Sequence, residues 1–165
     1  MTLGTVAYVG LGGNVGDAAG TLRAALSALD ALPGTRLLRA SRLYRTPAWG
    51  REDQPDFVNA VAALDTMLSA QALLDALLGV ERAFGRDRGA EAARWGPRIL
   101  DLDLLLHGDS VVDAPGLTVP HPHLLARAFV LVPLLEIAPD LDIPGRRSAR
   151  EALAAMATDG IEALP

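Results

Sequence analysis

The chain has 165 residues and a formal net charge of −5; 50% of its residues are hydrophobic and 21% are charged. This composition predicts one folded domain over residues 1–165 and argues against broad nucleic-acid binding, which needs a basic surface. No apolar run reaches the roughly 18 residues of a membrane span, and the first residues lack the basic region of a signal peptide. Cysteine is absent, so no disulfides can form. We therefore expect a cytoplasmic protein without membrane association.

The first half of the chain shows strand and helix patterns in alternation. Residues 5–11 alternate as a strand, and Asp17 can cap a helix that ends near Leu32. Further strands are expected over 36–45 and 57–64. A second helix follows, with Ser69 as its N-cap and its end near Gly85.

The stretch GLGGNVGD, residues 10–17, follows a predicted strand and precedes a predicted helix. It lacks the last glycine of the dinucleotide-binding pattern G-x-G-x-x-G, and no βαβ repetition follows. We therefore expect a tight turn in which glycine supplies positive φ.

The second half begins with a polar, arginine-rich segment, 86–97, whose composition predicts a loop. A strand is expected over 99–106, an irregular return over 115–122, and helices over 124–137 and 148–157. The order β-α-β-β-α-β predicts an α+β, ferredoxin-like sandwich with a mostly antiparallel sheet and additional C-terminal helices. In such a fold the helices pack on one face, and we expect the other face to be free for a site.

Two aspartates interrupt the apolar run RWGPRILDLDLLL, residues 94–106. Alternate residues of a strand share a face, so Asp101 and Asp103 should project together and away from the neighbouring leucines. Two adjacent carboxylates repel each other, and Mg²⁺, which prefers carboxylate and phosphate oxygens, would remove that repulsion. The pattern also fits two solvated acids, or acids paired with Arg94 and Arg98.

All 15 basic residues are arginines, which excludes a P-loop and Schiff-base lysine chemistry but leaves phosphate binding open. Several surround the aspartate pair in sequence: Arg82, Arg86, Arg88, Arg94 and Arg98, with His121 and Arg127 further on. Arginines beside carboxylate-bound Mg²⁺ are the equipment of phosphoryl transfer. A solvated loop of ion pairs is the alternative.

Histidines and aromatic side chains complete the candidate residues. His121 and His123 lack the further ligands of a transition-metal site, so contact with phosphate or simple exposure is expected for His121. The few aromatic residues near loops or strand starts fit either core packing or stacking on a flat heterocycle; they are Trp49, Phe57, Trp95 and Phe129.

Taken together, these stretches closely resemble the 6-hydroxymethyl-7,8-dihydropterin pyrophosphokinase family of folate biosynthesis. The matching stretches follow the family's order over roughly residues 5–140: GGNVGD, SRLYRTPAWG, DQPDFVNAV, ERAFGR, RWGPRILDLDLLL and LTVPHPHLLARAFVLVPLLEIAPD. The resemblance implies an ATP-dependent transferase that moves a pyrophosphoryl group to the pterin's hydroxymethyl oxygen and releases AMP. It also implies two Mg²⁺ ions, ATP as co-substrate and the ferredoxin-like fold, and we expect a monomer.

The resemblance also implies a role for each matching residue. Asp101 and Asp103 would hold the metal ions and act in catalysis with Arg86 and Arg98. The ATP-binding residues would be Glu81, Arg88, Trp95, Arg98, Thr118, His121 and Arg127. The pterin would contact Thr46, Pro47, Trp49, Phe57, Asn59, Asp101 and Phe129, with the two phenylalanines on its faces. The segment 86–97 would close over both substrates.

Two other functions remain open from the residues alone. Another Mg²⁺-dependent nucleotidyl or phosphoryl transferase would also use paired aspartates, but it would release a different product. A noncatalytic ferredoxin-like module would bind a ligand without turnover and would not need both aspartates.

Overall fold

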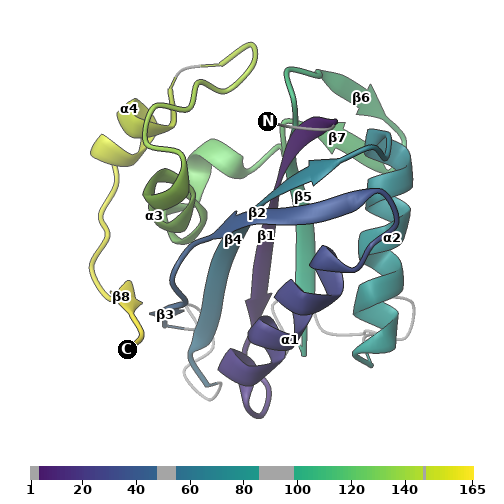
Figure 1. Cartoon of the computed structure of the whole chain (residues 1–165). Helices are drawn as coiled ribbons and strands as arrows, with labels where there is room; N and C mark the ends of the chain where they lie inside the picture. Colours follow the sequence, from purple (N-terminus) through teal and green to yellow (C-terminus); the bar gives the residue numbers. More distant parts are fainter. Residues whose placement is uncertain (1–3, 48–54, 86–98, 147) are drawn as a thin grey trace.

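The computed structural model describes residues 4–47, 55–85, 99–146 and 148–165 (Figure 1). The segment 86–97, and the calls for Trp49, Arg86, Arg88, Trp95 and Arg98 with it, lie outside these residues. The strands are β1 (Thr5–Gly13), β2 (Thr35–Ala40), β3 (Tyr44–Thr46), β4 (Phe57–Thr66), β5 (Asp101–His107), β6 (Val112–Ala114), β7 (Leu117–Val119) and β8 (Glu162–Ala163). The helices are α1 (Ala18–Asp30), α2 (Ala70–Ala83), the 3-10 turn η1 (Leu124–Ala126), α3 (Ala128–Ile137) and α4 (Ala149–Ala154).

Six of the described strands form one large antiparallel sheet in the order β5-β1-β4-β3-β8, with β2 also paired to β4. The strands β6 and β7 pair separately with each other. The ferredoxin-like α+β architecture expected from the sequence is therefore confirmed. The order also places β1 between β4 and β5, the two strands that carry the candidate polar residues.

Two elements differ from the sequence expectation. The strand expected over 36–45 is divided into β2 and β3, because Ser41 bonds Val61 through both its amide (2.9 Å) and its hydroxyl (3.0 Å) while the Arg42 amide turns away from β4. The return over 115–122 is not wholly irregular, since it contains β7.

The helices α1, α2 and α4 begin at side chains that accept hydrogen bonds from free backbone amides. Asp17 accepts from the Gly20 amide at 3.0 Å and Ser69 from the Ala72 amide at 3.1 Å, as expected from the sequence. The helix expected over 124–137 is instead η1 and α3, because Arg127 between them has extended backbone angles. The last helix, α4, is shorter than expected and begins after Ser148.

Helices lie against both faces of the sheet (Figure 1), and each face carries an apolar layer. On one face, α1 and α2 pack against β1, β4 and β5 through side chains that include Leu22, Leu77 and Leu102. On the other face, α3 and α4 cover strand residues that include Val61 and Leu105, and Leu131 of α3 belongs to this layer. The expectation of one open face is thus wrong where α3 and α4 lie, because the apolar side chains of β4 and β5 there must be removed from water.

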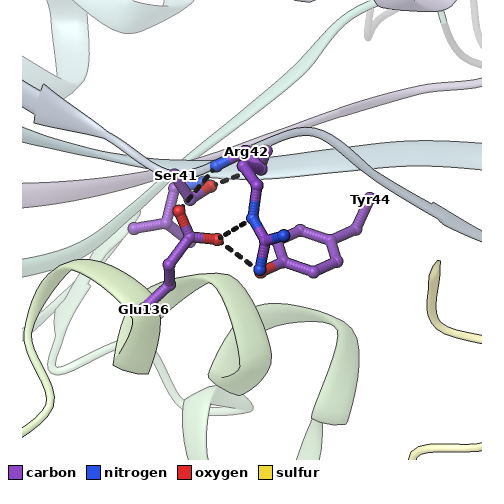
Figure 2. A network of polar contacts seen from close by, with 5 residues as sticks. Ser41, Arg42, Tyr44 and Glu136 are labelled. Carbon is purple, nitrogen blue, oxygen red and sulfur yellow. Dashed lines mark hydrogen bonds and ion pairs between the residues drawn. The ribbon is translucent and has the colours of Figure 1, made fainter. Parts of the chain in front are cut away.

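Hydrogen bonds and an ion pair connect Glu136 of α3 to Arg42 and Tyr44 at the edge of the large sheet. Figure 2 shows these side chains between the helix and the strand. The Glu136 carboxylate accepts from the Arg42 amide at 2.9 Å, from Arg42 Nε at 3.3 Å and from the Tyr44 hydroxyl. Burial alone would raise the pKa of the Glu136 carboxyl, but these donors outweigh burial and hold its pKa below the usual value. The carboxylate therefore stays charged at neutral pH.

We predict that Glu136→Gln lowers the free energy of unfolding at pH 7 by about 2 kcal/mol, the scale of hydrogen bonds to a charged group. A depressed folded-state pKa stabilises above the unfolded pKa, and this contribution disappears as pH falls through the folded value. Denaturant unfolding at several pH values measures the difference. It should shrink on acidification.

The control is Glu162→Gln, which removes only an exposed ion pair with Arg45 at 3.5 Å and should cost less. Equal losses for the two variants, or a Glu136→Gln difference that grows in acid, would contradict this account of the network.

Candidate active site

The registers of three strands place the candidate polar residues in one row across the sheet. Gly12 of β1 is the Cα partner of Asn59 on β4 and of Asp101 on β5, and Gly10 is the partner of Asp103. Partners in an antiparallel sheet project to the same face. Asn59 and the two aspartates therefore lie on one face, separated by a central strand that has no side chain at positions 10 and 12.

The aspartates are directed to that face by the leucines between them. Leu100, Leu102 and Leu104 are buried in the layer beneath α1 and α2, as the strand period predicts. The buried carboxylate of Glu81, on α2, accepts a hydrogen bond from the Leu102 amide at 2.7 Å. This contact from α2 fixes the backbone of β5 between its two aspartates.

The glycine-rich stretch differs from the tight turn that the sequence predicts. Gly10, Gly12 and Gly13 all belong to β1, and within this stretch only Gly16 has a positive φ, at 62°. The strand continues because each of these glycines pairs with a residue of β4. Gly10 and Gly12 leave the open face of the sheet without a side chain on β1, while Gly16 alone makes the turn before α1.

A cleft of about 430 Å³ adjoins Asp103 at the outer edge of β5. Its walls combine apolar side chains of α2, Leu74 and Leu78, with the polar residues Thr118 and His121. The structure thus brings Asp103, which is assigned to the metal ions, to one cavity with Thr118 and His121, which are assigned to ATP. Leu74 and Leu78 were not singled out in the sequence, because apolar helix residues usually pack in a core.

The imidazole of His121 faces the aspartates in its neutral form. Its Nδ1 accepts from the His123 amide at 3.1 Å, so the proton lies on Nε2, which is 3.9 Å from Asp103 Oδ1. Burial, together with the positive charge of Arg127, lowers the pKa of His121 to about 4. At neutral pH this residue can therefore donate a hydrogen bond from Nε2 without carrying charge.

Five of the residues expected around the pterin lie on or next to β3, β4 and the start of α3, namely Thr46, Pro47, Phe57, Asn59 and Phe129, while Asp101 lies on β5. Asn59 Nδ2 donates to Thr46 Oγ1 at 3.0 Å, and Thr46 is the Cα partner of Phe57. Pro47 follows directly after β3. Phe129 is the second residue of α3, and the Arg127 guanidinium carbon is 5.8 Å from the centre of its ring. Arg127 thus contacts one residue expected at the pterin, and its charge also acts on His121.

Within the described part of the chain, no group of three or more histidine, cysteine, aspartate or glutamate side chains could hold a metal ion. The aspartate pair alone still suits Mg²⁺, which commonly takes one or two protein carboxylates and completes its shell with substrate phosphates and water. Among the described helices, none has the length and hydropathy needed to cross a membrane.

The fold and this face define an α+β, ferredoxin-like protein with paired carboxylates beside a ligand-sized cleft. Residues 8–139 match the family model described as 7,8-dihydro-6-hydroxymethylpterin-pyrophosphokinase. The chain belongs to this family.

Individual relatives agree with the family match. The 2-amino-4-hydroxy-6-hydroxymethyldihydropteridine pyrophosphokinase of Pseudomonas aeruginosa is 52% identical over 158 residues, covering 96% of this chain and 96% of that protein. The Methylorubrum extorquens protein of the same name is 49% identical, covering 96% of this chain and 98% of that protein.

A solved structure supports the fold independently. The crystal structure of wild-type Plasmodium falciparum HPPK-DHPS aligns with a TM-score of 0.72 at 13% identity. The alignment covers 93% of this chain but only 45% of that chain, so this chain spans less than half the length of that protein.

Proposed function

We propose that this chain transfers the pyrophosphoryl group of ATP to the hydroxymethyl oxygen of 6-hydroxymethyl-7,8-dihydropterin, a step of folate biosynthesis. The observation that carries the proposal is the position of Asp101 and Asp103 on an open sheet face, between a cleft on one side and Asn59 on the other. Two substrates can therefore approach the carboxylates from opposite sides. Membership of the pyrophosphokinase family supports the same reaction.

Asp101 and Asp103 are the residues that would hold Mg²⁺, with two ions in all. When bound, Mg²⁺ would neutralise part of the triphosphate charge and favour ionisation of the attacking hydroxyl. The carboxylates suit this role because they share one face of β5 and the Asp103 side chain is 30% exposed. The Glu81 contact to Leu102 keeps this strand, and hence both carboxylates, in place.

The cleft is the proposed site of ATP. Leu74 and Leu78 offer apolar walls to a purine base, with Thr118 at the cavity and Glu81 behind β5. His121 can donate from Nε2 to a phosphate oxygen, and Arg127 can offer its guanidinium. Arg86, Arg88, Trp95 and Arg98 are assigned to ATP and catalysis through their family match alone.

The pterin site is proposed beside Asn59, between Phe57 and Phe129, with Thr46 and Pro47 around it; Trp49 is assigned to this site through its family match alone. Because Nδ2 of Asn59 is engaged by Thr46, its Oδ1 is the atom available to a ring N–H donor. Aromatic faces suit the flat heterocycle, and its hydroxymethyl group would then lie toward Asp101. In the reaction the hydroxymethyl oxygen attacks the β-phosphorus and its proton is released to solvent. The bond from this phosphorus to the bridging α-phosphate oxygen breaks, and AMP leaves with that oxygen.

We expect Asp103→Asn to lower kcat for AMP formation by about 100-fold, because it weakens charge stabilisation at the reacting phosphates. Chromatography of nucleotide and pterin products, with ATP, Mg²⁺ and the hydroxymethylpterin, measures the rate. The matched control, Asp109→Asn, changes an exposed aspartate in the turn after β5 and should retain the wild-type rate.

Release of pyrophosphate in place of AMP by the wild-type chain would establish the nucleotidyltransferase alternative. Binding of both substrates without turnover would establish the noncatalytic module. Normal turnover by Asp103→Asn would remove Asp103 from the metal site.

A second prediction concerns the pterin. Phe129→Ala should weaken pterin binding by about 1–3 kcal/mol, the contribution of one aromatic stacking face, with little change in ATP binding. Calorimetry with an ATP analogue present measures both affinities. Phe129→Leu keeps most of the side-chain volume but has no flat face. Its pterin affinity should lie between the affinities of the wild-type chain and of Phe129→Ala. Unchanged pterin affinity in Phe129→Ala would return this side chain to a packing role.

A further inference from the structure

Gly12 occupies a position where a glycine is unfavourable for the backbone alone. It lies inside β1 with partners on both sides, and it is not among the glycines with positive φ. A glycine within a strand weakens it and often marks a place where a ligand or another chain segment comes close. The side chains on the open face next to Gly12 must therefore explain this glycine.

The space above Gly12 is limited by one atom. A Cβ built at this position would lie 2.9 Å from Asn59 Oδ1, and the next neighbour, the Val58 carbonyl oxygen, would be 3.8 Å away. At Gly10, on the same face of the same strand, a Cβ would lie 3.6 Å from the Leu105 side chain, which is an ordinary contact. A methyl group is thus tolerated at position 10 but would press on the Asn59 carboxamide at position 12.

The Asn59 carboxamide has little freedom to move away. Its side chain is buried, with the residue 8% exposed, and Nδ2 is held by Thr46 Oγ1 at 3.0 Å. Among the described residues, no donor reaches its Oδ1. A buried amide oxygen without a donor among these residues is uncommon, and it can accept a hydrogen bond from water or from a ligand.

From these contacts we infer that Gly12 is a specificity-determining residue: its missing side chain keeps Asn59 Oδ1 open to a ring N–H donor of the heterocycle. This inference rests on the proposed function and adds a determinant for its pterin substrate. Gly12 itself makes no bond to the ring. It acts by leaving free the surface between Asn59 and Asp101, so that a flat molecule can lie across β1.

The test compares steady-state kinetics of Gly12→Ala and Gly10→Ala with those of the wild-type chain. Gly12→Ala should raise KM for the pterin at least about tenfold, as expected when a site's polar group is blocked, with KM for ATP within about twofold. Gly10→Ala should raise the pterin KM less. Equal pterin KM values for wild type and Gly12→Ala, equal increases for both variants, or equal losses for both substrates would overturn the inference.

A double-mutant cycle with Asn59→Ala separates blocking of Oδ1 from a general strand effect. Once Oδ1 is absent, adding Gly12→Ala should change the pterin KM by less than about threefold, because the two changes act on one contact. An undiminished effect in the Asn59→Ala background would overturn the inference.

The cycle also decides the case in which Gly12→Ala alone does not fold. The double variant lacks the atom that the methyl group meets and should fold, as thermal unfolding would show; failure of both variants to fold would contradict the inference. Absence of AMP formation by the wild-type chain is a separate result, which would refute the proposed function and this inference together.

Discussion

The arrangement of this protein depends on the register of β1 between β4 and β5. That register joins Asn59, Gly12 and Asp101 in one row and sets Gly10 beside Asp103. A slip of one residue would turn the aspartates into the apolar layer and bring leucines to the open face. The same alternation that buries Leu102 and Leu104 beneath the helices therefore presents the carboxylates for chemistry. In β5, the register that buries the leucines is therefore the same register that exposes the two aspartates.

The second apolar layer decides how much of the sheet remains open. Val61 and Leu105 lie on the same face as Asn59 and Asp103, and α3 covers them because exposed apolar surface is unfavourable. The position of α3 is further fixed by Glu136, which binds the backbone and side chain of Arg42 and the hydroxyl of Tyr44. Since Phe129 lies in the first turn of this helix, the network holds one wall of the proposed pterin site at a set place on the sheet. Stability and substrate recognition are linked through one helix.

Much of this could be predicted from the sequence, because the relevant signals are local. Period-two alternation placed Asp101 and Asp103 opposite the leucines, and Asp17 and Ser69 marked the starts of their helices. The division of the strand at Ser41, the Glu136 network and the covered second face depend on contacts between residues far apart in the chain, which no local pattern carries. Gly12 shows the same limit: GLGGNVGD is typical of a turn, and only the pairing with Asn59 and Asp101 reveals a strand with an open surface. The roles of the individual site residues remain predictions, and the family match supplies those that lie outside the described residues.

The most direct test of this account is a crystal structure of the chain with Mg²⁺, a non-hydrolysable ATP analogue and 6-hydroxymethyl-7,8-dihydropterin. The account predicts the pterin ring across Gly12 with a ring nitrogen within hydrogen-bond distance of Asn59 Oδ1, the purine in the cleft beside Leu74 and Leu78, and Mg²⁺ bound by Asp101 and Asp103. A pterin located in that cleft, or metal ions bound away from both aspartates, would contradict it.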